Sequence, residues 1–371
     1  MILLQFQMTQ SSTEPCFLYK KAKNQVVIII FFWVDDICLL CRDLETQQQF
    51  EKYFHSQFDT RKIGGLSNFI NLDWYHDQLN HTLAISSESY ISNAITRFQL
   101  ESLPNSYIPI RSDFLKANAK EAESSPKVNT ELYQQMIGTA IWLSITTRFD
   151  IKAAISMLSH HIKDPREFHM KELNRLFGYL QTTKQKRFYF GSTTDSRLYL
   201  FSDSDHATDT TDYDSRYGSL IFYKNTLISA ESHKIGLIPD SSTEAEYYAM
   251  HYTIDRMLWL QKITNELSPV NESPVLFNDN LSAQKIAEAA NDTIRSKHYG
   301  TKVYRTRKLV KDGALQLVHL PSKDNLADIL TKTQTKDLFN VHSSRLLDAR
   351  YIDFRSTAIK GHLTESIPFS S

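Results

Sequence analysis

The chain has 371 residues, of which 42 are Lys or Arg and 42 are Asp or Glu, so a formal net charge of zero excludes a globally basic nucleic-acid binder. Its three cysteines are too few for a disulfide scaffold and fit a reducing compartment. The longest apolar run, Val26 to Val34, is much shorter than the about 20 residues that cross a bilayer, so we expect an intracellular protein with no membrane partner.

The predicted elements begin with a β-hairpin over residues 17–42. A short strand, Phe17–Tyr19, is followed by a polar turn and by the β-branched and aromatic run Val26–Phe32. Ile37–Leu40 is the next predicted strand, and the segment Trp33–Asp36 lies between the two runs. Two adjacent carboxylates therefore stand at the tip of a hairpin between apolar strands.

Helical and polar segments follow. The pattern over 45–58 suits a helix, whereas residues 104–128 are polar, contain three prolines and are interpreted as a linker. Residues 132–163 are expected to be helical with a break near 148–150, and 166–180 forms another amphipathic helix with leucines at helical spacing.

The second half of the chain alternates strands and helices. Strands are expected at 198–202, 218–223, 227–229, 275–277 and 315–320, and helices at 243–267, at 282–289 and from 326 onward. This order predicts an α/β fold in which helices cover a central sheet of mixed strand direction.

Four carboxylates fall at the ends of these elements. Asp203 ends the first strand, Glu246 lies in the first turn of the long helix, Asp279 follows a strand and Asp328 opens the last helix. Carboxylates from separated segments converge only where something offsets their repulsion, and a pair of divalent cations about 3.5–4 Å apart does so. Oxygen ligands favour Mg²⁺, with Mn²⁺ as the alternative, so two such ions are the expected cofactors.

Each carboxylate also has a purely structural interpretation. Asp203 and Asp279 are suited to turns, and Asp205 is a rival of Asp203 on the same strand face. Asp328 is suited to the positive end of a helix dipole, with Asp324 before it. The set of four in this order indicates a metal site more strongly than any single member.

Glu246 has the sharpest alternative role. Thr243 and Glu246 have the spacing of a capping box, in which Glu246 closes the start of the helix. Ser241 and Glu244 have the same spacing, and if Ser241 is the cap, Glu246 is available to a metal.

A basic segment lies between the third and fourth carboxylates. It contains six cationic residues, interleaved with aromatic ones: Arg295, Lys297, Lys302, Arg305, Arg307 and Lys308. One interpretation is a solvated helix face, and the other is a nucleic-acid-binding element that contacts phosphates.

Several of these segments resemble one family. The run Ser241–Glu246, with the sequence Ser-Ser-Thr-Glu-Ala-Glu, and the run Asn325–Lys332, with the sequence Asn-Leu-Ala-Asp-Ile-Leu-Thr-Lys, are similar to the ribonuclease H region of copia-type retrotransposon Pol polyproteins. Ser202–Asp205 and Asp279–Asn280 fit the same pattern. The resemblance implies a mixed five-stranded sheet with flanking helices and an enzyme that hydrolyses the RNA strand of RNA–DNA hybrids by a two-metal mechanism.

The same resemblance implies site residues. Asp203, Glu246, Asp279 and Asp328 would be the catalytic metal ligands. His319 lies in a strand and is expected to be structural, because the loop before the last carboxylate offers no imidazole.

The first half resembles the reverse transcriptase of this family. The segment Trp33–Asp36 is similar to the Tyr-Val-Asp-Asp turn, which would make Asp35 and Asp36 polymerase ligands. A polymerase palm needs a third carboxylate from an earlier strand, and the residues before Asp35 offer only Glu14, in a polar stretch without strand character. We therefore expect vestigial ligands and a lost polymerase activity, unless missing parts of the polyprotein supply the rest.

The resulting expectation is a Pol fragment in four parts. These are a partial reverse-transcriptase palm at 1–103, a linker with connecting helices at 104–190, a ribonuclease H-like domain at 191–340 and a C-terminal tail at 341–371. The family implies an RNA–DNA hybrid as partner and a place in cytoplasmic virus-like particles or the nucleus; oligomeric state is left open. The alternative function is a degenerate, non-catalytic remnant that at most binds nucleic acid.

Overall fold

The computed structural model describes residues 6–61, 64, 67–77, 79–80, 82–191, 193–206, 214–236, 238–268, 272–288, 300–348 and 352–357. Two compact units divide the chain. Unit 1 comprises Met1–Phe69 and Asp255–Asn271, and unit 2 comprises Ile70–Ile254 and Glu272–Ser371. Among the described residues, no helix is both long and apolar enough to cross a membrane.

Unit 1 contains a four-stranded antiparallel sheet in the order β1 (Thr9–Gln10), β2 (Phe17–Ala22), β3 (Gln25–Trp33) and β4 (Asp36–Cys41). Helix α2 (Leu44–Gln57) follows it. The predicted hairpin and helix are confirmed, although β2 and β3 extend further into the turn than expected. The short β5 (Asn68–Phe69) also belongs to this unit.

Local chemistry explains these elements. The β2–β3 turn is tight because Lys23 and Asn24 both adopt positive φ, of 51° and 63°. Asp43 caps α2, since its Oδ1 accepts the Thr46 backbone N–H at 2.8 Å. Ile30 and Phe50 are buried in the core of this unit, which binds the helix to the sheet by apolar burial.

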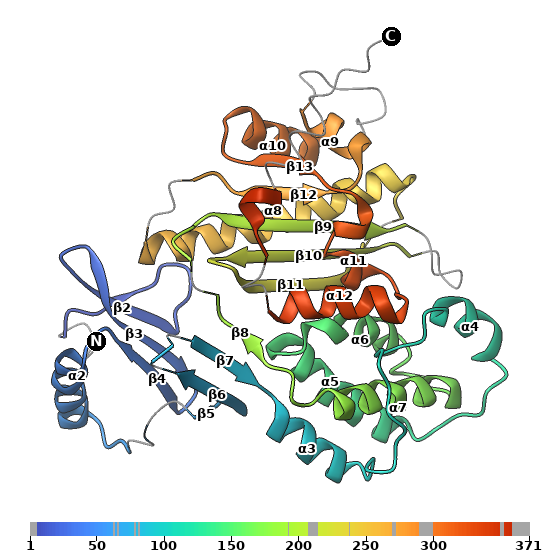
Figure 1. Cartoon of the computed structure of the whole chain (residues 1–371), viewed down its shortest axis with the longest axis horizontal. Helices are drawn as coiled ribbons and strands as arrows, with labels where there is room; N and C mark the ends of the chain where they lie inside the picture. Colours follow the sequence, from blue (N-terminus) through green and yellow to red (C-terminus); the bar gives the residue numbers. More distant parts are fainter. Residues whose placement is uncertain are drawn as a thin grey trace. The chain divides into compact units, whose positions relative to one another are not determined.

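Unit 2 is built around a five-stranded sheet in the order β11-β10-β9-β12-β13 (Figure 1). The strands span β9 (Leu198–Asp205), β10 (Arg216–Tyr223), β11 (Thr226–Lys234), β12 (Val275–Asn278) and β13 (Gln316–His319). β9, β10 and β11 run antiparallel, whereas β12 is parallel to both β9 and β13. The expected α/β class, with a mixed five-stranded sheet and flanking helices, is confirmed.

Two of the three helices given next lie where the sequence pattern predicts helices, over 243–267 and 282–289. α8 (Ser242–Leu267), α9 (Leu281–Glu288) and α10 (Gly300–Lys311) come before β13. The helix expected from residue 326 is wrong in its extent: α11 (Asp328–Thr331) is a single turn, and α12 (Lys336–Leu347) is a separate helix.

A helical layer precedes this sheet in unit 2. It contains α3 (Glu88–Arg97), α4 (Phe114–Glu121), α5 (Thr130–Thr146), α6 (Lys152–Ser159) and α7 (Glu167–Thr182). A small antiparallel group of strands, β6 (Leu72–Asp77), β7 (Thr82–Ser86) and β8 (Phe188–Tyr189), lies in the same unit. The sequence pattern did not predict α3, β6 or β7.

The predicted break near residues 148–150 is confirmed, because a 3-10 turn at Phe149–Ile151 separates α5 from α6. Arg148 is only 1% exposed, and its guanidinium pairs with Asp150 at 3.0 Å. Ser343 on α12 donates to the same carboxylate at 3.1 Å. This buried charge pair therefore ties α12 to the helical layer.

Two segments that were interpreted as part of a linker and as a C-terminal tail contribute side chains to the core. The supposed linker at 104–128 contains α4, and Phe114 is 1% exposed in the core. The boundary expected at 340 falls inside α12, and Phe354 in the supposed tail is 2% exposed in the same core. Both segments carry large apolar side chains within polar sequence, and those side chains decide their packing. The four-part division itself stays a prediction.

Candidate functional site

The centre of the site is the edge of the sheet at which β9 and β12 end. These two strands are parallel, so the residues at their carboxyl ends reach the same edge. Asp203 lies in β9, which continues to Asp205 instead of ending before Asp203 as expected. Asp279 directly follows β12. The sheet order thus brings together residues that are far apart in sequence.

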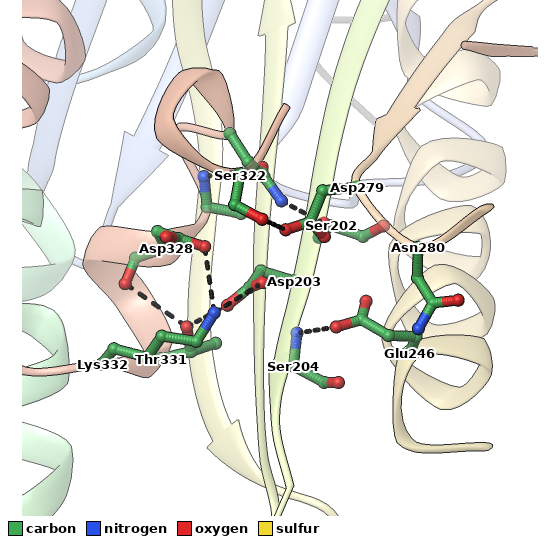
Figure 2. Close-up of polar contacts among 12 residues, drawn as sticks. Ser202, Asp203, Ser204, Glu246, Asp279, Asn280, Ser322, Asp328, Thr331 and Lys332 are labelled. Carbon is green, nitrogen blue, oxygen red and sulfur yellow. Dashed lines mark hydrogen bonds and ion pairs between the residues drawn. The ribbon is translucent and has the colours of Figure 1, made fainter. Parts of the chain in front are cut away.

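Three of the four predicted carboxylates form one group. Asp203, Asp279 and Asp328 each offer a carboxylate oxygen, and these oxygens lie within 4.8 Å of one another. Asp203 and Asp328 are buried and Asp279 is half-buried. Figure 2 shows the three side chains, from β9, the loop after β12 and the start of α11, pointing toward one another. Their assignment as metal ligands stays a prediction.

Helix α11 reaches this group because β10 carries a glycine opposite Asp203. Gly218 pairs with Asp203 across the two strands. A Cβ atom on Gly218 would lie 2.8 Å from the Leu330 Cβ and 2.9 Å from the Ala327 backbone oxygen. A side chain of any size would therefore push α11, and Asp328 with it, away from β9.

Glu246 lies beside the group but outside it. Its Oε1 accepts the backbone N–H of Ser204 at 3.1 Å, and its Oε2 accepts the Asn278 amide N–H at 2.9 Å. The helix-capping alternative is also decided: Ser241 Oγ accepts the Glu244 N–H at 3.2 Å, and the Glu244 carboxylate accepts the Asp240 N–H at 2.9 Å. Glu246 is therefore not needed to cap α8.

Burial and mutual repulsion raise the pKa values of two carboxyl groups in this site. Burial, and then the charge of Glu246, raise the pKa of Asp203 well above its usual value, although Lys332 opposes the shift. Burial, and then repulsion by Asp279, raise the pKa of Glu246 to about 7, while hydrogen bonds from Asn278 and Ser204 oppose the shift. When ionised, these carboxylates carry more negative charge than the neighbouring groups neutralise. Such a set of oxygen ligands is suited to binding one or more divalent cations.

We expect the metal-free protein to lose stability as the pH rises. The pKa of Glu246 is about 7 in the folded state against 4.5 for the unperturbed group. Between these values the folded chain holds a proton that the unfolded chain has released, so the free energy of unfolding falls with pH, by up to about 3 kcal/mol. Thermal unfolding across this window measures the effect.

A substitution and an added metal ion serve as controls for this pH prediction. Glu246→Gln cannot titrate and should flatten the pH dependence of the unfolding midpoint. Mg²⁺ should flatten it too, because a cation among the carboxylates favours their ionised forms. A wild-type midpoint that rises with pH over the same window, in metal-free buffer, would contradict the raised pKa.

Sequence reasoning missed several residues that hold this site. The Asn278 amide bonds Glu246 and also the Ser202 backbone oxygen, at 3.3 Å. The Asn325 amide donates to that same oxygen at 2.9 Å. Asn278 directly precedes Asp279, and Asn325 is the first residue of the motif Asn325–Lys332, so these positions were the available signal.

Thr331 and Lys332 end the motif Asn325–Lys332, and both contact the carboxylates. The Thr331 hydroxyl donates to Asp203 Oδ2. Lys332 Nζ lies 3.2 Å from Asp203 Oδ1 and 3.2 Å from Asp328 Oδ1 (Figure 2). They lie at the end of the single turn that starts with Asp328, so the turn supplies both a carboxylate and its neighbours.

The loop after β13 supports Asp279. The Ser322 hydroxyl donates to Asp279 Oδ2 (Figure 2). The His319 Nε2 atom lies 3.2 Å from the Asp279 backbone oxygen, which fits the structural role expected for His319. A cavity of about 870 Å³ is lined in part by His319, Asp324 and Arg345. None of the four carboxylates is among its lining residues.

The basic segment is described only in part. Arg295 and Lys297 lie outside the described residues, and so does the side chain of Lys302. On α10, Arg305 and Lys308 are exposed. Arg307 is half-buried, and its Nε donates to the Ile286 backbone oxygen at 2.8 Å. That bond closes the end of α9, so Arg307 has a structural role beside the predicted one.

In unit 1, Asp35 and Asp36 lie at the exposed β3–β4 turn, where Val34 adopts a φ of 54°. The three-carboxylate group in unit 2 is the one metal-type cluster of acidic, histidine or cysteine side chains found among the described residues. Hence no described carboxylate joins Asp35 and Asp36 to complete a polymerase-type group.

Sequence comparisons agree with the motifs. The family model described as reverse transcriptase (RNA-dependent DNA polymerase) matches residues 1–112. The chain is 24% identical over 333 residues to the retrovirus-related Pol polyprotein from transposon TNT 1-94 of Nicotiana tabacum, covering 89% of this chain and 25% of that protein. It is 27% identical over 338 residues to the one from transposon RE1 of Arabidopsis thaliana, covering 90% and 22%. The predicted resemblance to copia-type Pol polyproteins is therefore confirmed.

The chain spans about a quarter of the length of these curated relatives. Among solved structures, an N-terminal ribonuclease H domain from Mycobacterium tuberculosis matches with 12% identity and a TM-score of 0.29, covering 40% of this chain and 97% of that one. A foamy viral protease–reverse transcriptase in complex with an RNA/DNA hybrid matches with 13% identity and a TM-score of 0.31, covering 57% and 27%. The strand order of the five-stranded sheet defines the fold of unit 2.

Proposed function

We propose that this relative of the retrotransposon Pol polyproteins hydrolyses the RNA strand of RNA–DNA hybrids. The observation that carries the proposal is the group of Asp203, Asp279 and Asp328, whose carboxylate oxygens lie within 4.8 Å of one another beside Glu246. When bound there, a pair of divalent cations would activate a water molecule and stabilise the leaving 3′-oxygen. Mg²⁺ is the expected ion, with Mn²⁺ as the alternative.

The residues of the chain divide the work. Asp203, Asp279 and Asp328 would hold the cations, with Glu246 as the fourth ligand. Glu246 is fixed by Ser204 and Asn278, so its carboxylate is oriented before a substrate arrives. Such preorganisation lowers the barrier, because little rearrangement remains for the reaction itself.

Substrate binding would use the exposed cations of α10. Arg305 and Lys308 are exposed on that helix, and phosphate contacts by such residues supply sequence-independent affinity that falls with salt. A hybrid duplex is recognised by its shape and by 2′-hydroxyl groups across a wide minor groove. The partner is therefore a nucleic acid of defined form and not of defined sequence.

For the polymerase half we propose vestigial ligands. Asp35 and Asp36 have no third carboxylate beside them among the residues that the structure describes, and a polymerase needs one to hold its metal ions. These residues by themselves would not support DNA synthesis; parts of a longer polyprotein could complete them. We also propose that the protein is located in cytoplasmic virus-like particles or in the nucleus.

A labelled RNA–DNA hybrid tests the nuclease proposal. We expect purified protein with Mg²⁺ to cut the RNA strand, and Asp279→Asn to remove nearly all of this activity because it takes one ligand charge from the group. Equal cleavage by both proteins would point to a contaminant. Absence of cleavage from both, with hybrid binding retained, would favour the alternative of a non-catalytic nucleic-acid-binding remnant.

A further inference from the structure

The side chain of Lys332 reaches into the middle of the acidic site. Its ammonium nitrogen lies 3.2 Å from Asp203 Oδ1 and 3.2 Å from Asp328 Oδ1. The Asp203 side chain is 1% exposed and the Asp328 side chain 11%, whereas Lys332 keeps 38% of its side chain exposed. A positive charge therefore bridges two of the three grouped carboxylates, and its stem extends toward solvent.

We propose that Lys332 is the internal counterion of this site: its ammonium group takes the place of a cation between Asp203 and Asp328, and a divalent ion must displace it to bind there. The inference rests on the proposed function only in so far as both use the same carboxylates. It concerns metal affinity and assembly of the site, not the hydrolysis itself.

The first argument is electrostatic. Buried carboxylates without a neighbouring positive charge are costly, and removing one partner of a buried pair leaves the other uncompensated. Asp203 and Asp328 come from β9 and from α11, which lie 125 positions apart by residue number. When both carboxylates are ionised and no metal is present, a positive charge stabilises their close approach, and Lys332 is the cation that contacts both among the described residues.

The second argument is geometric. Lys332 follows the last residue of α11 and adopts extended backbone dihedrals, with φ −120° and ψ 149°. Within the described residues, the Lys332 ammonium group donates hydrogen bonds only to Asp203 and Asp328. The four-carbon stem of a lysine is flexible, so the ammonium group can swing outward once these two bonds are replaced.

The third argument concerns Asp203, whose two oxygens have different partners. Oδ2 accepts the Thr331 hydroxyl, whereas Oδ1 accepts Lys332. The Thr331 hydroxyl is buried with the α11 turn and would keep Asp203 in place after the lysine has left. Oδ1 is thus the oxygen that exchanges an ammonium group for a metal ion.

Calorimetric titration with Mg²⁺, in the absence of nucleic acid, tests the proposal on the full chain. We expect Lys332→Met, which keeps the length but not the charge, to bind Mg²⁺ at least about tenfold more tightly than wild type, because nothing has to be displaced. Its metal-free unfolding midpoint should fall, and Mg²⁺ should raise that midpoint more than in wild type.

Two further variants serve as controls. Lys332→Arg keeps the positive charge and should bind Mg²⁺ no more tightly than wild type. Lys323→Met removes an exposed lysine on the neighbouring loop and should leave the Mg²⁺ affinity within about twofold of wild type, because exposed charges are screened.

Mg²⁺ affinity of Lys332→Met that equals or falls below the wild-type value overturns the proposal. If Lys332→Met is unfolded without metal, Mg²⁺ should restore the fold, and failure to do so overturns it as well. The nuclease proposal can fail separately. If wild type cleaves the hybrid but Lys332→Met binds Mg²⁺ with unchanged affinity, only the counterion proposal is overturned. If Lys332→Met binds Mg²⁺ more tightly but wild type does not cleave the hybrid, only the nuclease proposal is overturned.

Discussion

Asp203→Asn should abolish hybrid cleavage while leaving the metal-free protein as stable as wild type or more stable. The loss of rate should reach at least about a thousandfold, or about 4 kcal/mol of transition-state stabilisation, since a neutral amide cannot hold a divalent ion as a carboxylate does. Asp203 is 0% exposed and central in the acidic group. We therefore expect the Asp203 carboxylate to be needed for the reaction and to lower the stability of the metal-free fold.

The expected stability of Asp203→Asn follows from the raised pKa of Asp203 in the wild type. Burial is the largest cause of that raised pKa, and the charge of Glu246 is the next. At high pH the folded wild type must keep this buried carboxylate charged, and asparagine removes that cost. The gain in unfolding free energy should grow with pH and nearly vanish in acid, where the aspartate is protonated. Chemical unfolding in metal-free buffer at several pH values measures it.

Asp205→Asn is the matched control, because Asp205 lies on the same strand face but outside the three-carboxylate group. It should cleave the hybrid within about threefold of wild type, because Asp205 is not among the residues expected to hold the cations. If Asp205→Asn lost cleavage and Asp203→Asn kept it, the rival assignment would hold instead.

Gly218→Ala is expected to damage both the fold and the site through one methyl group. The added Cβ would lie 2.8 Å from the Leu330 Cβ and 2.9 Å from both the Ala327 oxygen and the Thr331 Cγ2. Overpacking against backbone cannot be relieved by a side-chain rotation, so we expect a loss of about 2–3 kcal/mol in unfolding free energy.

The effect of Gly218→Ala on activity should exceed what lower stability alone explains. Displacing α11 moves Asp328 relative to Asp203, and a misplacement of about 1 Å at a reacting centre costs about a hundredfold in rate. Cleavage should be measured well below the unfolding temperature of the variant. An active variant with wild-type cleavage would show that the close approach of α11 to β10 is not needed.

Gly138→Ala provides the control for this substitution. Gly138 lies within helix α5, and a Cβ there would meet nothing within 4 Å. Alanine should therefore raise the unfolding free energy by about 0.5–1 kcal/mol through its better helix propensity, and it should leave cleavage unchanged.

Local sequence patterns determined much of this protein. The β-branched and aromatic runs within 17–42 predicted the hairpin of unit 1, and the apolar runs of the second half predicted all five strands of the central sheet. The apolar spacing predicted α7. The same patterns placed Asp203, Glu246, Asp279 and Asp328 at element ends. They did so because strand and helix periodicity is a property of neighbouring residues, as is the resemblance carried by short motifs such as Asn325–Lys332.

Only the tertiary structure decided how these residues meet. The sheet order gathered Asp203, Asp279 and Asp328 but bonded Glu246 to Ser204 and Asn278 instead. It also packed Phe114 and Phe354, from segments with polar sequence, into the core. The physical reason is that such contacts join residues far apart along the chain. Burial, repulsion and the space left by Gly218 set them, and none of these quantities exists until the strands have paired.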